Sequence, residues 1–226
     1  MLLSLFFSAP MLALVWLSAL VVALTVHEFA HAIVGKWRGD DTAEHMGRLT
    51  LNPLSHIDPF GFLMLITLGF GWARPVPFDP RNLASPLRDG LFIALAGPAA
   101  NLVMAAIAGA AFRVLYGFGG AGLDTMLGAF LVLSVLVNLL LLIFNLIPVH
   151  PLDGSKVVDV LLVGTRFEGI QRWLTVNGPR IMLIAVLVSI LSPFDPFFFI
   201  HVPAFAGCDY LLGASCGGLL GLYFGG

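Results

Sequence analysis

The sequence predicts an all-α, polytopic integral membrane protein, because it is too apolar for a water-soluble domain. Hydrophobic residues occupy 59% of the 226 positions and charged residues only 11%, whereas soluble domains are about 25% charged. The mean hydropathy is +0.98. Apolar stretches long enough to cross a bilayer as helices recur along the chain. We therefore expect one domain over residues 1–226 with about four to five transmembrane helices, a core at about 11–165 and C-terminal helices at about 166–226.

The first predicted span covers residues 11–35, whose 25 residues make a helix of about 37 Å. A polar connection follows, and residues 59–72 are apolar again, but this stretch is short for a span. We interpret it as a re-entrant or interfacial segment. Residues 48–51 and 73–78 carry β-like residues and prolines, which suggests a short β-ribbon near the functional site.

Two further spans are predicted at about residues 91–116 and 126–147, separated by a glycine-rich turn. Residues 153–175 have the pattern of a short amphipathic helix at the membrane interface. A fourth span is expected at about 180–200, although two prolines interrupt it. The glycine-rich tail, residues 204–226, is either a fifth membrane segment or a surface segment.

The basic residues predict the orientation of these helices. Six of the eleven lysines and arginines lie in residues 36–88, and four more lie in residues 156–180. The positive-inside rule places both regions in the cytoplasm and the N-terminus outside. The net charge of −2 gives no indication of a nucleic-acid partner. Cys208 and Cys216 are either a disulfide in an oxidising compartment or two free thiols.

Three ionisable side chains stand together in the first span: His27, Glu28 and His31. On a helix, His27 and His31 lie one turn apart on the same face, so both imidazoles can bind one metal ion. Glu28 occupies the position of the general base in zinc hydrolases with this spacing. The alternative is a polar patch that packs helices together, but ionisable groups at membrane depth are costly without a function.

A catalytic zinc site needs a third protein ligand, and the candidates are His45, His56, His150, His201 and Asp153. Asp153 is favoured because Pro148 and Pro151 end the third span just before it and Gly154 lets the chain turn after it. Asp153 then lies at the cytoplasmic end of the third span, level with His31 at the cytoplasmic end of the first span. Asp153 also fits as the N-cap of the next helix, and His150 is the competing ligand. The other three histidines are expected on the surface.

These motifs together resemble the site-2 protease family of intramembrane zinc metalloproteases, over about residues 15–165. The resemblance rests on His27, Glu28 and His31 within a span, followed much later by Asn145, Pro148, Pro151 and the Leu152-Asp153-Gly154 sequence. Gly97 and Asn101 match the Gly-x-x-x-Asn motif of the family. The sequences around residues 47–59 and 72–78 are similar to short bacterial members, so we expect no PDZ or CBS domain.

The resemblance implies that His27, His31 and Asp153 bind one Zn²⁺ per chain and that Glu28 is the catalytic base. It implies transmembrane protein or peptide substrates, a location in the bacterial inner membrane, and an active site near the cytoplasmic side. Gly97, Asn101 and Asn145 are then candidates for binding substrate or stabilising the oxyanion. Small-residue helix packing at Gly97, and a bond from Asn145 to backbone at the helix end, are the alternatives.

We therefore expect a zinc-dependent intramembrane endopeptidase. One alternative is a metal-binding or metal-transporting membrane protein, which needs no base and is favoured by additional acidic residues in the spans; the spans contain almost none. The other is an inactive protease homologue that acts as a scaffold, against which the presence of Glu28 argues.

Overall fold

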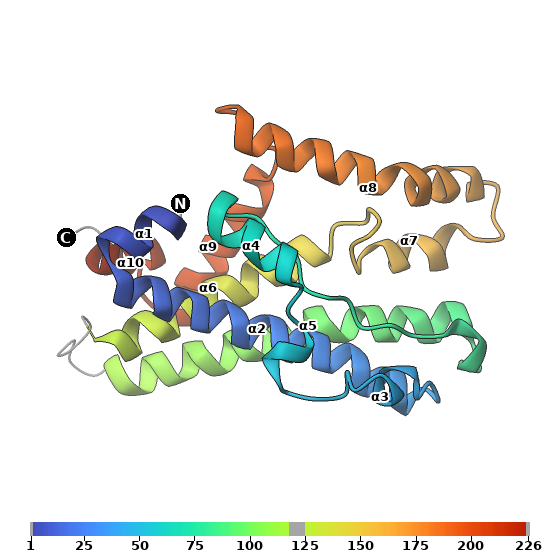
Figure 1. The fold of residues 1–226 in the computed structure, drawn as a ribbon, viewed down its shortest axis with the longest axis horizontal. Helices are drawn as coiled ribbons and strands as arrows, with labels where there is room; N and C mark the ends of the chain where they lie inside the picture. The colour runs from blue at the N-terminus through green and yellow to red at the C-terminus, as the bar shows by residue number, and fades with distance from the viewer. Residues whose placement is uncertain (1, 118–124, 225–226) are drawn as a thin grey trace.

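The computed structural model describes residues 2–117 and 125–224, with side chains from Leu5 onward. Those residues are mostly helical and include no β-strand, which confirms the predicted all-α class (Figure 1). Four of their helices are long and apolar enough to cross a membrane, or five if one bent helix pair counts as a single span.

The centre of the fold is a bundle of three long helices that run side by side (Figure 1). They are α2 (Pro10–Trp37), α5 (Pro86–Tyr116) and α6 (Met126–Asn145). Small side chains such as Ala23, Ala105 and Ala129 are fully buried where these helices meet, and small residues let helix backbones approach closely in membrane proteins. The first three predicted spans are therefore present, with ends that differ by a few residues from those expected.

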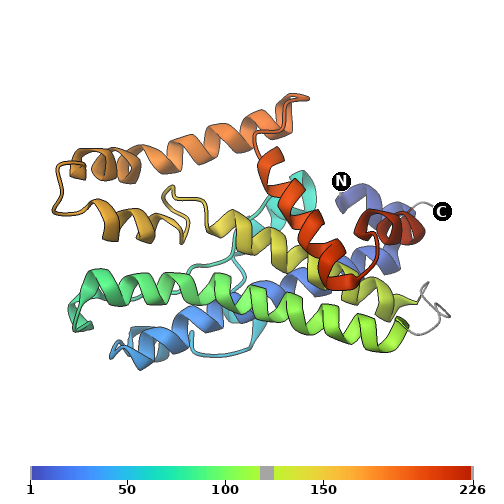
Figure 2. The ribbon, with the colours of Figure 1, turned by 180° about the vertical axis from the view of Figure 1, so that it is seen from behind.

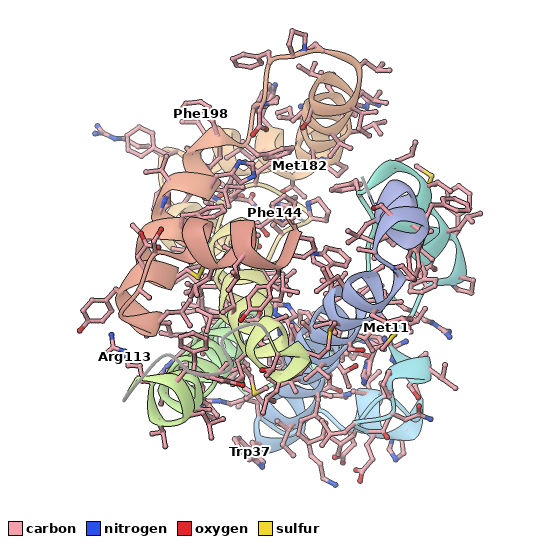
Figure 3. The ribbon with its side chains drawn as sticks, turned by 90° about the vertical axis from the view of Figure 1, so that its left-hand side faces the viewer. Met11, Trp37, Arg113, Phe144, Met182 and Phe198 are labelled. Atoms are coloured by element: carbon pink, nitrogen blue, oxygen red, sulfur yellow. A yellow bond between two sulfur atoms is a disulfide. The ribbon has the colours of Figure 1, made fainter. Side chains whose placement is uncertain are left out.

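The C-terminal segment packs against this bundle at the end opposite the predicted cytoplasmic loops. Helix α9 (Phe198–Leu212) lies against α6, and α10 (Cys216–Phe224) follows at an angle of 90° (Figure 2). The cysteines at this corner, Cys208 and Cys216, form a disulfide. Arg113, near the end of α5, donates hydrogen bonds to the main-chain carbonyls of the same corner (Figure 3). Helix α1 (Leu2–Ser8) lies at this end too.

The connection between α2 and α5 holds a short apolar helix, α4 (Pro59–Leu68), which Asp58 caps at its N-terminus. Helix α4 reaches far enough to contact α1, and the extended chain after Gly69 runs back toward the beginning of α5 (Figure 1). Residues 59–72, predicted to be re-entrant or interfacial, thus form a short helix followed by chain that turns back. The predicted β-ribbon is not formed in the described structure, where the only pairing is one bridge between Ile57 and Ala73. Prolines 75 and 77 lack the N–H groups that a ribbon requires.

Short elements complete this connection: α3 (Thr42–His45) and 3-10 turns at Pro53–Ser55 and Pro80–Asn82. Asp40, 1% exposed, holds the two ends of the connection together. Its carboxylate accepts hydrogen bonds from Thr42, from the Asp79 N–H and from the Asn82 side chain. Burial raises the pKa of Asp40, but these hydrogen bonds outweigh it and leave the pKa below its ordinary value.

The helices after residue 153 differ from the prediction. The expected helix at 153–175 is divided into α7 (Ser155–Leu162) and the start of α8 (Glu168–Leu191), because the chain turns at Gly164 with a φ of 76°. The helix that contains the fourth candidate span therefore begins at residue 168, not near 180, and ends before Pro193. Pro179 lies within α8 without ending it, as prolines often do in membrane helices.

Candidate metal centre

The structure brings together the three residues that were expected to bind a metal. His27 and His31 lie on one face of α2, and Asp153 lies in the turn between α6 and α7. The two Nε2 atoms are 3.0 Å apart, and Asp153 Oδ2 lies 3.3 Å from the first and 3.4 Å from the second. Both histidines are buried. Within the described residues this is the only group of three or more metal-ligating side chains close enough to hold one ion.

The hydrogen bonds behind the imidazoles determine which nitrogens face the centre of this cluster. His27 Nδ1 lies 2.6 Å from Asn101 Oδ1, and His31 Nδ1 lies 2.7 Å from the main-chain oxygen of Ile93. Both oxygens can only accept, so each Nδ1 carries a proton and donates it. In neutral imidazoles the two Nε2 atoms then carry lone pairs.

When both imidazoles are neutral, three electron-rich atoms therefore converge with no proton between them. Asp153 Oδ2 is buried and receives no hydrogen bond from the described residues, although both Nε2 atoms lie close to it. Such an arrangement is repulsive unless a cation lies among the three atoms. Two imidazoles and one carboxylate, with the histidines oriented from behind, match a catalytic zinc site. The residues present thus fit a zinc ion.

Asn101 lies at the metal cluster, behind the His27 imidazole. Its side chain is fully buried in α5, and its Nδ2 donates to Asn138 Oδ1 at 2.8 Å and to the Ala23 carbonyl at 3.4 Å. Both the oxygen and the nitrogen of the Asn101 amide are therefore hydrogen-bonded to other described residues. In this structure Asn101 orients His27, and its contact with substrate or the oxyanion stays a prediction.

Gly97, one turn before Asn101 on α5, lies directly against the imidazoles. A β-carbon at this position would be 2.5 Å from His31 Nε2 and 2.6 Å from His27 Nε2, which is much closer than a carbon can approach. Glycine is therefore required here to leave space for the two imidazole rings, beyond any role in helix packing.

The turn from residue 146 to 154 aims Asp153 into the bundle. The Gly154 N–H donates to the Asn145 carbonyl at 2.7 Å, so the chain folds back on the end of α6. A β-carbon on Gly154 would collide with the main chain of Leu146. Helix α7 begins at Ser155 with no side-chain cap, and the N-cap alternative for Asp153 is therefore excluded.

The Asn145 amide donates to the Leu141 carbonyl at 3.0 Å. This is the backbone hydrogen bond that was the alternative to a role of Asn145 in binding substrate.

The remaining histidines lie elsewhere. His150 Nε2 is 3.6 Å from Asp159 Oδ2 in α7, and Asp159 also accepts from Lys156 and Gln171. Burial raises the pKa of Asp159, but these bonds outweigh it and lower the pKa.

His45 and His201 are exposed, as expected. His56 was expected on the surface but is 2% exposed, because its Nε2 bonds to the Thr50 carbonyl and anchors the loop.

Glu28 is buried beside the cluster, and an extended strap, residues 73–78, passes next to it. The Glu28 Oε2 atom accepts a hydrogen bond from the Val76 N–H at 3.1 Å. Arg48, also buried, donates from its guanidinium to the carbonyls of Arg74 and Pro75. Burial lowers the pKa of Arg48, and the negative charge of Glu28 opposes that shift. The two side chains are therefore close enough for their charges to attract each other. Sequence reasoning missed Arg48 because an arginine in a polar loop has no distinctive pattern.

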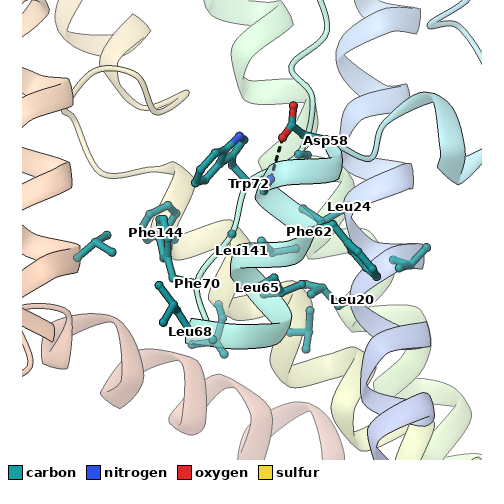
Figure 4. A pocket seen from close by; sticks show the side chains of 18 of the residues that line it. Leu20, Leu24, Asp58, Phe62, Leu65, Leu68, Phe70, Trp72, Leu141 and Phe144 are labelled. Carbon is teal, nitrogen blue, oxygen red and sulfur yellow. Dashed lines mark hydrogen bonds between the residues drawn. The ribbon is translucent and has the colours of Figure 1, made fainter. Parts of the chain in front are cut away.

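An apolar cavity of about 570 Å³ opens next to this site. Its walls come from α2, α4, α6, α8 and α9, and they include Leu24, Trp72, Leu141 and Phe144 (Figure 4). Thr25, which also lines the cavity, is three residues before Glu28 on α2. The cavity thus begins about one helical turn from Glu28.

Comparisons with known proteins agree with this geometry. The family model of peptidase family M50 matches residues 15–188. The Bacillus subtilis protein named "Putative zinc metalloprotease YwhC" is 42% identical over 146 residues, which are 63% of this chain and 67% of that protein. The Mycobacterium tuberculosis protein named "Putative zinc metalloprotease Rip2" is 31% identical over 179 residues, 76% of this chain and 65% of that protein.

These matches span about two thirds of the length of each relative. No solved structure matches the chain. The family match covers more than half of the chain and includes His27, Glu28, His31 and Asp153. The chain is therefore an integral membrane protein that belongs to peptidase family M50, the site-2 protease family.

Proposed function

We propose that this protein is a zinc-dependent intramembrane endopeptidase that cleaves membrane-spanning peptides near the cytoplasmic side of the bacterial inner membrane. The observation that carries this proposal is the convergence of His27 Nε2, His31 Nε2 and Asp153 Oδ2, with Glu28 buried next to them. The family match supports the same chemistry.

In this proposal His27, His31 and Asp153 hold one zinc ion per chain. A zinc ion in such a site lowers the pKa of water and polarises the carbonyl of the scissile bond. The Glu28 carboxylate takes a proton from the attacking water and returns it to the nitrogen of the leaving amine, so that the peptide bond breaks without net loss or gain of protons. The bond from the Val76 N–H holds this carboxylate in one orientation.

The substrate is proposed to be a membrane-spanning segment that enters the apolar cavity. A helical carbonyl is already hydrogen-bonded and shielded, so the peptide must unwind before water can attack it. The cavity next to Thr25 accommodates apolar side chains of such a segment. The strap at residues 73–78 is extended, and it is the part of the wall best suited to hold unwound backbone.

The orientation is proposed from the basic residues at residues 36–88. The disulfide at the α9–α10 corner supports it, because disulfides persist in oxidising compartments and this corner lies at the opposite end of the bundle. A cysteine at exposed Asp41 should be protected from an impermeant thiol reagent in sealed cells, and a cysteine at exposed Met126 should react. The reverse labelling pattern would contradict the orientation.

A metal transporter is the weaker candidate. Transport requires further polar or acidic sites along the pathway, and the described residues contain one cluster able to hold an ion. An inactive scaffold leaves the Glu28–Val76 contact without a purpose.

The test is Glu28→Gln, which keeps the shape of the side chain but removes the base. The purified variant should keep about one zinc per chain and lose cleavage of a model membrane-spanning substrate in vesicles. Glu44→Gln is the matched control, because Glu44 is exposed and, within the described residues, forms its ion pair with Lys36. Cleavage by Glu28→Gln at the wild-type rate would contradict the mechanism.

A further inference from the structure

A line of buried polar groups leads from the metal centre into the apolar interior of the bundle. It runs from His27 on α2 through Asn101 on α5 to Asn138 on α6. Asn101 and Asn138 are 0% and 1% exposed. A buried amide among apolar side chains is costly unless its hydrogen bonds are made. Asn138 is not one of the three candidate metal ligands. Its presence therefore needs an explanation.

The direction of every hydrogen bond in this line is determined by its far end. The Asn138 Nδ2 donates to the main-chain carbonyl of Ser134 at 2.8 Å, and a carbonyl can only accept. The Asn138 Oδ1 must then face Asn101 and accept from its Nδ2, also at 2.8 Å. This turns the Asn101 Oδ1 toward His27, where it can only accept the proton on Nδ1.

We propose that Asn138 is a positioning residue that acts through Asn101 to keep His27 in the tautomer with a free Nε2. The proposal rests on the proposed zinc site. Without the Asn138 acceptor, the partner that the described residues leave for the Asn101 Nδ2 is the Ala23 carbonyl at 3.4 Å, which is a longer and weaker hydrogen bond than the 2.8 Å bond to Asn138. The amide can then reverse and donate to His27 Nδ1, which moves the imidazole proton to Nε2 and removes that nitrogen as a ligand.

The test measures zinc affinity of the purified full-length chain by competition with a chromophoric chelator. Asn138→Leu should weaken zinc binding by about 10- to 100-fold, the usual effect of removing a group that orients a ligand. Asn138→Asp keeps an acceptor oxygen toward Asn101 and should bind zinc nearly as tightly as the wild type. Ser134→Ala is the matched control, since it lies one turn away and the line uses only its carbonyl.

A double-mutant cycle separates this role from a general effect on folding. If Asn138 acts through Asn101, Asn101→Leu alone and the Asn101→Leu/Asn138→Leu double variant should lose the same zinc affinity. Cobalt(II) provides a second readout, because loss of one imidazole changes its visible spectrum. Asn138→Ala is made in parallel and removes the acceptor without adding bulk in case the leucine variant does not fold.

Wild-type zinc affinity in a folded Asn138→Leu or Asn138→Ala variant would overturn the proposal. Additive losses in the double variant, or equal losses in Asn138→Asp and Asn138→Leu, would also overturn it. If the wild-type chain itself binds no zinc, the proposed function fails. If the wild type binds zinc and the Asn138 variants bind it with the same affinity, the positioning role alone fails.

Discussion

The two sides of the molecule around the cavity are built differently. In the apolar part of α6, 61% of residues are buried inside the protein, whereas the corresponding part of α8 is only 11% buried. The α2–α5–α6 side holds the metal cluster and the amides that orient it, and every one of those amides is hydrogen-bonded. The α8 side contributes mostly apolar side chains to the wall of the cavity.

This difference separates two requirements of the proposed reaction. A metal site needs ligands held within a fraction of an ångström, which close packing provides. Entry of a membrane-spanning peptide needs a wall that can yield, and a helix with few packed contacts is the part of a fold that opens at lowest cost. We call the α2–α5–α6 side the packed side. We infer that changes on the packed side alter metal binding, whereas changes on α8 alter substrate use.

The largest expected effect is loss of the metal from the packed side. Asp153→Ala removes one of three ligands and should abolish stoichiometric zinc binding, because the buried imidazoles alone do not complete a zinc site. His150→Ala should keep the metal, since His150 faces Asp159 in α7. The zinc content of the two purified variants shows whether Asp153 or His150 is the third ligand. Zinc lost only from His150→Ala would place the metal site nearer α7 and α8 and contradict the assignment of metal binding to the packed side.

A smaller but still large effect is expected from one methyl group in α5. Gly97→Ala places a carbon 2.5 Å from His31 Nε2, so the imidazoles must move and zinc affinity should fall. Gly90→Ala on the same helix is the control, because its new methyl meets only Phe78 at an ordinary 3.9 Å. Equal zinc affinity of the two variants in a chelator competition would mean that the imidazoles yield easily and that this side is not rigid.

The smallest of these effects is expected on α8. Ser189 lines the cavity, and Ser189→Phe should lower kcat/KM for a membrane-spanning substrate by roughly tenfold, or about 1.4 kcal/mol, with zinc content unchanged. Leu187→Phe, two residues earlier and outside the cavity lining, should leave kcat/KM as it is. A zinc loss in Ser189→Phe would show that the two sides are coupled.

Sequence patterns predicted the packed side well because its signals are local. The spacing of His27 and His31 on one helix, and the prolines and glycine around Asp153, restrict the backbone within a few residues. The first three spans could be found for the same reason, since hydropathy is a local property.

The rest depends on contacts between distant segments. The roles of Asn101 and Asn138 require α5 and α6 to be placed against α2, although an amide in the middle of an apolar span was a signal that could have revealed Asn138. The start of α8 was missed because Arg172, Asn177 and Pro179 dilute its apolar pattern. His56 is buried through a loop contact that no periodicity predicts.

The most direct test of the central claim is X-ray absorption at the zinc edge, measured on the purified full-length chain loaded with zinc. We predict a shell of light atoms at about 2.0–2.2 Å, with the scattering of two imidazoles and no sulfur, and loss of this signal in Asp153→Ala. A shell that contains sulfur, a single imidazole, or a spectrum unchanged by Asp153→Ala would contradict a zinc centre formed by His27, His31 and Asp153.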